Sequence, residues 1–166
     1  MPGKDESLTV RVSSAYKQLS SAATELNTVS DELGKFVGAL DTALKKLNLG
    51  ISTWIRLDSR EDGLGNYSKR DLGYAKVGGK WGIALRTMNG NHNTPDISNV
   101  EEWLFNEAPR ALRIESIEKL PDLFDGLIKE AESATSQIRA RTSQAQHLAH
   151  ILTEIASHQP MRKTEL

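Results

Sequence analysis

Three side chains near the end of the chain have the types and the spacing of a metal site. His147, His150 and Glu154 follow one another at steps of three and four residues, so a helix brings them to one side. In the heptad frame described below they fall on outward positions, where charged and polar side chains are mostly solvated. We therefore interpret them as an exposed helix face, and we predict neither a metal nor a cofactor.

The other candidates for acid–base chemistry lie in segments that are typical of loops. His92 and Asp96 stand among asparagines, glycine and proline, which are the usual residues of turns. Asp58, Glu61 and Asp62 are likewise expected to be exposed loop charges. The sequence contains no phosphate-binding loop and no dinucleotide-binding motif. We predict that the protein has no catalytic residues and no small-molecule substrate, and that it is not an enzyme.

The composition fits a protein that buries only a narrow stripe of apolar side chains. Of the 166 residues, 38% are hydrophobic and 5% aromatic, which is low for a compact globule but expected of coiled coils. A net charge of −1 argues against bulk electrostatic capture of nucleic acid or of acidic membranes. The sequence has no cysteine, no signal peptide and no membrane-spanning stretch, so we expect a soluble cytoplasmic protein with no membrane contact.

Two long stretches repeat apolar and small residues at alternating steps of three and four, the a and d positions of a heptad pattern. The first spans residues 8–47 and the second residues 117–155. The second long helix is expected to begin at Pro121, after a separate short helix over residues 110–119. The expected seam residues are Leu19, Leu26, Leu33, Leu40, Phe124, Leu127, Ile138, Arg141 and Leu148.

We expect the two long helices to pair with each other in antiparallel orientation, because the insert between them can reverse the chain. Leu40 then lies near Phe124, and Leu26 lies near Ile138. The alternative is that each helix pairs with a helix of another chain. Arg141 occupies a seam position, where a polar residue more often fixes register or partner choice than performs chemistry.

A small antiparallel sheet is predicted between the helices. Gly78 and Gly79 form a two-residue turn, which is one of the stronger local indications of a hairpin, and this turn pairs Val77 with Lys80. A polar loop separates the hairpin from a further strand. The three expected strands span residues 51–58, 72–77 and 80–88.

These elements define the expected fold class, α+β: a long antiparallel coiled-coil helical hairpin with an inserted small three-stranded antiparallel β-sheet and a short helix. So small a sheet has few residues left to cover its faces and edges, and such surfaces invite partners. The alternative is that the helical arm or the loop before the short helix folds back and closes them. The expected parts are an N-terminal coiled-coil helix over residues 1–49, the β insert over residues 50–108, and the short and C-terminal coiled-coil helices over residues 109–166.

The insert also carries the residues that we expect to contact a partner. Between residues 51 and 88 it has seven Lys and Arg side chains against four Asp and Glu, with aromatic residues interleaved. Aromatic side chains among cations bind single-stranded nucleic acid by stacking and backbone contacts. The competing interpretation, which we favour, is that the aromatic residues form the insert's own core. A protein partner or self-association is therefore expected before nucleic acid. The candidate partner-binding residues are Trp54, Tyr74, Lys76, Lys80, Trp81 and Arg86.

The architecture predicts a non-enzymatic interaction or assembly protein, in which a coiled-coil arm gives length and the β tip or the arm holds a partner. The order of elements, with β structure between long terminal helices, is similar to that of prefoldin-type chaperone subunits. That resemblance implies an oligomer assembled by β hairpins, with helical arms that hold unfolded clients. Two other classes remain open: a small inhibitor, immunity or regulatory protein that binds one macromolecule, and a nucleic-acid accessory protein that uses the basic insert.

Overall fold

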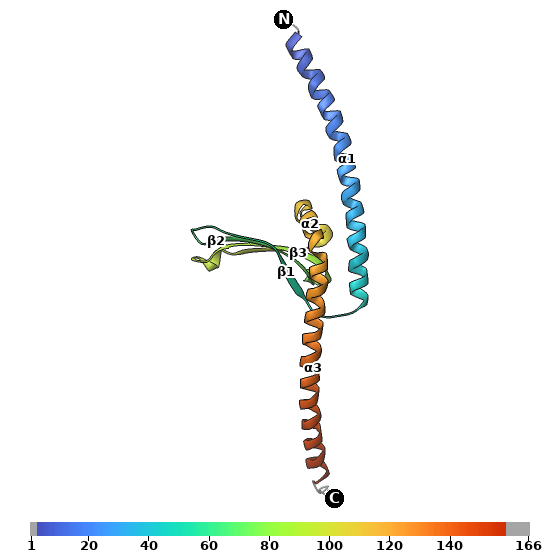
Figure 1. Cartoon of the computed structure of the whole chain (residues 1–166), viewed down its shortest axis with the longest axis vertical. Coiled ribbons are helices and arrows are strands. Elements are labelled where there is room, and N and C mark those ends of the chain that lie inside the picture. Colours follow the sequence, from blue (N-terminus) through green and yellow to red (C-terminus); the bar gives the residue numbers. More distant parts are fainter. Residues whose placement is uncertain (1–2, 159–166) are drawn as a thin grey trace, which may run out of the picture.

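The structure, a computed structural model, describes residues 3–158 (Figure 1). Two long helices flank a sheet, a short helix and three single 3₁₀ turns. The bounds are α1 Gly3–Lys46, β1 Thr53–Glu61, β2 Asn66–Val77, β3 Lys80–Asn91, η1 Pro95–Ile97, β4 Asn99–Leu104, η2 Phe105–Glu107, α2 Arg110–Ser116, η3 Ile117–Lys119 and α3 Leu120–Ser157.

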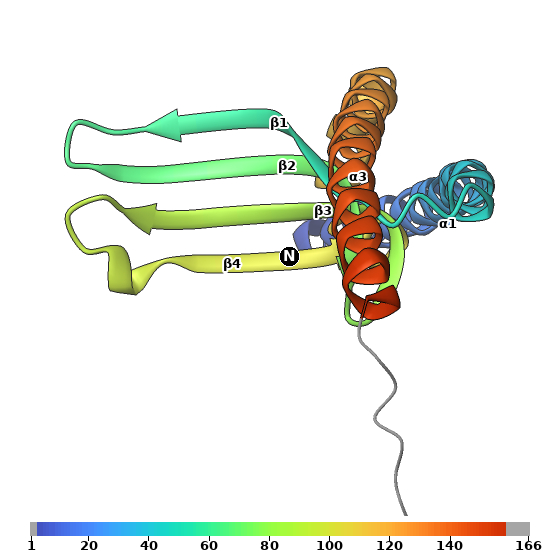
Figure 2. The ribbon, with the colours of Figure 1, turned by 90° about the horizontal axis from the view of Figure 1, so that it is seen from below.

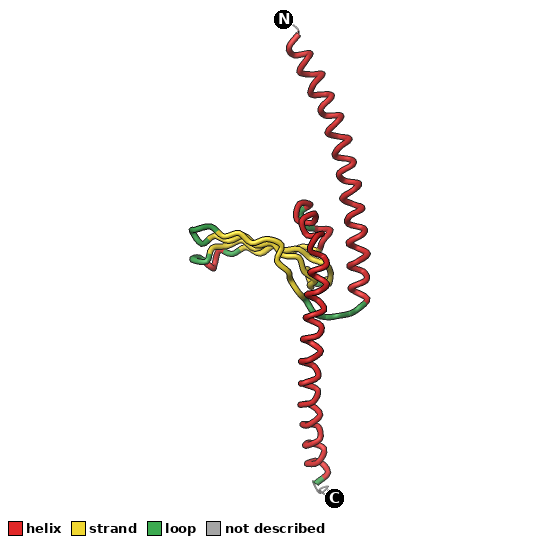
Figure 3. Tube along the Cα trace, viewed as in Figure 1, coloured by secondary structure: helices red, strands yellow, loops and turns green. Residues whose placement is uncertain are grey.

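The molecule is an extended rod whose two ends lie at opposite poles (Figures 1 and 3). α1 enters from one pole and α3 leaves toward the other, so the two helices run in the same sense and overlap only near the middle of the rod. The strands project sideways from this middle section (Figure 2). Each long helix therefore has one half beside the sheet and one half that extends away from it.

The expected fold class is wrong in two respects. The sheet has four antiparallel strands in the order β1-β2-β3-β4, where three were expected. α1 and α3 extend in opposite directions from the sheet, so they form no antiparallel coiled-coil hairpin (Figure 1). The expected contact between Leu26 and Ile138 is not made, and Leu40, the expected neighbour of Phe124, stays exposed.

The fourth strand was missed because its residues lack the alternation of a half-buried strand. β4 carries Glu101 and Glu102 at its centre, and charged side chains are typical of edge strands that avoid pairing with other chains. The hairpin, by contrast, lies where its turn chemistry placed it. Gly78 and Gly79 have φ of 56° and 83°, and Val77 pairs with Lys80.

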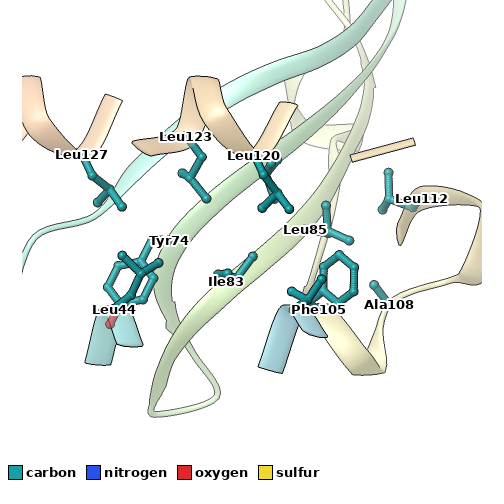
Figure 4. Close-up of a cluster of buried hydrophobic side chains, with 12 residues drawn as sticks. Leu44, Tyr74, Ile83, Leu85, Phe105, Ala108, Leu112, Leu120, Leu123 and Leu127 are labelled. Atoms are coloured by element: carbon teal, nitrogen blue, oxygen red, sulfur yellow. The ribbon is translucent and has the colours of Figure 1, made fainter. Parts of the chain in front are cut away.

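The core lies on one face of the sheet, and both long helices pack against it (Figure 4). Burying a leucine or isoleucine side chain contributes about 2 kcal/mol whatever surface covers it. The apolar face of the sheet therefore competes with a second helix for the same heptad stripes, and near the middle of the rod the sheet is the surface that they meet. The buried side chains are Leu72, Tyr74, Ile83 and Leu85 of the sheet, Leu120, Leu123 and Leu127 of α3, Val37 and Leu44 of α1, and Phe105, Ala108 and Leu112 of the segment between the sheet and α3.

α1 also closes the edge of β3 where β4 stops short. β4 ends opposite Ala84, and the next backbone N–H, that of Ile83, donates to Oδ1 of Asp41 at 2.7 Å. Asp41 thus takes the place of a strand partner for a backbone donor that would otherwise be unsatisfied. The Lys45 ammonium lies 2.6 Å from Oδ2 of the same carboxylate. This contact ties α1 to the edge of β3.

Candidate functional site

Beyond the sheet, each long helix continues as an arm whose described side chains are all exposed. We call residues 3–25 the α1 arm and residues 135–157 the α3 arm; each comprises 23 residues, about 35 Å of helix. Along both arms the a and d positions form a mostly apolar row, here called the arm stripe. Leu19 is 66% exposed and Ile138 is 65% exposed. The stripe residues are Leu8, Val12, Ala15, Leu19 and Ala22 on α1, and Ile138, Arg141, Ala145, Leu148, Leu152 and Ile155 on α3.

The expected seam residues fall into two groups. Leu127 is buried in the core, and Leu33 and Phe124 pack against it in part. The other six remain exposed, and none of them meets the long helix that was expected to cover it. They are Leu19, Leu26, Leu40, Ile138, Arg141 and Leu148.

On α1 the seam row is only partly covered beside the sheet, because the side of the helix next to it faces the core. Phe36, in the seam row, is 72% exposed, whereas Val37 and Leu44 are buried. These two positions lie outside the predicted seam. The sequence does contain a signal for them. Near Val37 and Leu44, apolar residues occupy positions a, d and e of the heptad, which is the wider apolar face of a helix that packs on a globular core.

Two arginines of α2 hold the base of the α1 arm. Arg110 donates to Oδ1 of Asn27 at 2.9 Å, and Arg113 donates to Oγ of Ser30 at 3.3 Å. An apolar cleft opens beside them, lined by Leu26 among others. The arm is therefore anchored at its base and bare above it.

The six candidate partner-binding residues of the insert do not form one surface. Tyr74 is buried on the core face, where its ring stacks on Trp81 with centroids 5.6 Å apart. Burial raises the pKa of the Tyr74 hydroxyl, and the nearby carboxylate of Asp41 raises it further. Lys76 and Lys80 are exposed on either side of the hairpin turn.

The opposite face of the sheet is covered by its own side chains. Trp54 lies over Gly73, where a β-carbon would meet the indole ring. The Arg86 guanidinium stacks on that ring, 4.2 Å from its centroid. This pair covers the small-residue face at Gly73, and Asp41 and Leu104 lie beside Gly82 on the same face.

Most of the basic side chains of the insert pair with two carboxylates. Arg86 donates to Oδ2 of the buried Asp71 at 2.7 Å, and Arg56 Nε lies 2.6 Å from Oδ1, although not in hydrogen-bonding geometry. Asp58 accepts hydrogen bonds from Arg70 and Arg60. Four of the seven cations are thus paired. The hydrogen bond from Arg70 is the largest cause that lowers the pKa of Asp58.

The far end of the sheet is a set of internally satisfied turns. Asp62 accepts hydrogen bonds from the Asn66 side chain, from the Asn66 N–H and from the Leu64 N–H, and these bonds lower the pKa of Asp62. His92 lies 3.3 Å from Glu61 and against the ring of Tyr67. The polar groups of this tip hold the tip together.

The histidines of the α3 arm lie on an exposed surface. His150 Nε2 is 3.3 Å from Glu154 Oε1, and His147 is exposed as well. Within the described residues, no group of three His, Asp or Glu side chains has the arrangement of a metal site. None of the described helices combines the length and the apolarity needed to cross a membrane.

Comparison with protein-family models, with curated proteins and with solved structures found no match to this chain.

Proposed function

We propose that the protein is a non-enzymatic assembly protein whose two arms take up helices of a protein partner. The observation that carries this proposal is the state of the arm stripes. They have the heptad spacing of helices that pair, and they are bare on both arms. Contiguous exposed apolar surface of this kind marks interaction sites in soluble proteins.

The sheet supports the proposal as the part that positions the arms. The core holds one half of each long helix, and Asp41, Arg110 and Arg113 fix the α1 side. A rigid middle section that points two helices in opposite directions suits a spacer or an assembly unit.

The other functional classes stay predictions. A prefoldin-like holdase, a small inhibitor or regulatory protein and a nucleic-acid accessory protein each need a partner surface. The pairing of Arg56, Arg86, Arg60 and Arg70 with carboxylates leaves the nucleic-acid class with less free charge. A chain without cysteine fits a reducing compartment, and we propose a cytoplasmic location.

The test compares three versions of the full chain purified under the same conditions. The stripe variant carries Leu19→Asp with Ile138→Asp, and the control carries Thr24→Asp with Ser136→Asp, which adds the same charges on the outward helix faces. Light scattering after size exclusion gives the mass of the protein with whatever it has bound. We expect wild type and control to exceed the 18.3 kDa of one chain and the stripe variant to equal it. A stripe variant that associates as wild type does would overturn the proposal.

A further inference from the structure

We infer that the helices taken up by the arms belong to a second copy of this chain: the α1 arm of one copy pairs with the α3 arm of the other, antiparallel, at both ends of the rod. This inference rests on the proposed function and names its partner. Four features of the described residues lead to it: direction, length, stripe pattern and charge.

Direction follows from the rod shape (Figure 1). α1 runs from its pole toward the sheet, and α3 runs from the sheet toward the other pole. A twofold axis across the middle of the rod places the α3 arm of the second copy beside the α1 arm of the first, with opposite chain direction. The same rotation forms the second arm pair at the other pole, so the contact is isologous and closes at two copies.

Length and register agree with this arrangement. The two arms have the same length, 23 residues. When position 25 faces 135 and position 3 faces 157, the bases of the two arms meet and so do their tips. In that register every facing pair sums to 160. An a position of one helix then lies opposite a d position of the other, as antiparallel coiled coils require. The heptad frame allows registers seven residues apart, and this is the register in which the two arms, as defined above, overlap over their full length.

The facing residues are complementary in size. Ala22 faces Ile138, and Ala15 faces Ala145, so small residues lie opposite a large or another small one where the helices approach closely. Leu8 faces Leu152 near the tips. Arg141 is the single charged member of the stripes and faces Leu19. Its aliphatic stem can pack there while the guanidinium bonds Oε1 of Gln144 at 3.0 Å, as it already does.

Charge and area are compatible with a stable pair. Residues 6–25 carry two acidic and two basic side chains, and residues 135–157 carry one acidic and two basic. No like-charge block opposes association. Each arm pair covers seven large apolar stripe residues. If each of these residues buries on the order of 80 Å², the two arm pairs together remove on the order of 1,000 Å² of surface from water. This area is about the lower bound for a specific interface.

The absence of cysteine from the sequence makes disulfide trapping a direct test. Full-length Ala15→Cys and Ala145→Cys proteins are mixed in reducing buffer and then oxidised. Because Ala15 faces Ala145 of the other copy, we expect a covalent dimer between the two variants, formed about tenfold more than between matched controls Ser14→Cys and Ser143→Cys. The control cysteines lie on outward helix faces.

Each other outcome has a defined meaning. Cross-links of Ala15→Cys with itself, or of Ala145→Cys with itself, at the same yield would overturn the antiparallel pairing and leave the proposed function standing. A wild-type complex that contains a different polypeptide and no cross-linked dimer would overturn the second copy as partner. The proposed function fails separately, when Leu19→Asp with Ile138→Asp leaves association unchanged.

Discussion

The two halves of α3 carry the same heptad pattern in different surroundings. Leu120 and Leu127 lie against the sheet and are buried, whereas Leu148 and Ile155, in the same heptad row on the arm, are exposed. The side-chain types do not distinguish the two halves, and only the neighbouring sheet does. An apolar stripe therefore predicts that a helix face will be covered, but the surface that covers it is decided by the rest of the fold or by another molecule.

The largest difference between the halves is expected from truncated leucines. Leu123→Ala should lower the free energy of unfolding by about 3 kcal/mol, because it leaves a cavity in a fully buried site. Leu148→Ala should change unfolding of the core by less than about 0.5 kcal/mol. Urea unfolding followed by tryptophan fluorescence reports on the core alone, since all three tryptophans lie in strands. Equal losses in the two variants would contradict the division into core and arm.

A smaller contrast is expected between two carboxylates. Asp71 is buried beneath Arg56 and Arg86, so Asp71→Asn should destabilise the protein by about 2 kcal/mol, as two guanidinium groups lose their anion. Glu154→Gln removes an exposed partner of His150 on the α3 arm and should have almost no effect. The same fluorescence-detected unfolding measures both. A silent Asp71→Asn would mean that the arginines are satisfied by water.

The contact between α1 and the β3 edge should contribute less again. Asp41→Ala leaves the N–H of Ile83 without its acceptor, and we expect a loss of about 1 kcal/mol. Asp31→Ala, an exposed carboxylate on the same helix, is the matched control. If both variants unfold alike, then another group fixes the departure of α1 from the sheet.

The smallest effect is a pH dependence confined to the sheet. The pKa of Asp58 is held below its ordinary value of 3.8, mainly by the hydrogen bond from Arg70. Its contribution to stability is therefore present above pH 3.8 and is lost as the pH falls through the lowered pKa. Arg70→Gln should flatten the acid side of the stability curve, and His150→Ala on the arm should leave it unchanged. If wild type and Arg70→Gln lose stability equally as the pH falls, then Asp58 does not contribute to the pH dependence.

Local signals in the sequence predicted local structure correctly. The hairpin register follows from Gly78 and Gly79, because a two-residue turn with positive φ fixes which residues pair. The first helix ends as expected near Asn48 and Gly50, which both adopt positive φ. β1 was placed about two residues too early, and it continues past a bulge between Arg56 and Asp58 to Glu61. β2 was predicted too short, since it begins at Asn66, within the expected polar loop.

The heptad pattern could not predict how the two long helices are arranged relative to each other. The stripe positions were recognised, but periodicity states only that a face is apolar, so the pairing of α1 with α3 within the chain was wrong. The buried Val37 and Leu44 were missed because they stand beside the chosen row. For the insert, Trp54 and Arg86 were marked as partner-binding, whereas in the structure they cover their own sheet. The function of the six marked residues stays a prediction.

The central claim is that the core is self-sufficient and the arms are covered by association. Isolated helices of this length are marginal in water, so uncovered arms should exchange their amide hydrogens quickly. Hydrogen exchange read by mass spectrometry should show residues 6–25 and 135–157 protected in wild type and in Thr24→Asp with Ser136→Asp. The same residues should be unprotected in Leu19→Asp with Ile138→Asp, while β2 and β3 stay protected in all three. Equal arm exchange in the three proteins, or loss of protection in β2 and β3 of the stripe variant, would contradict the account.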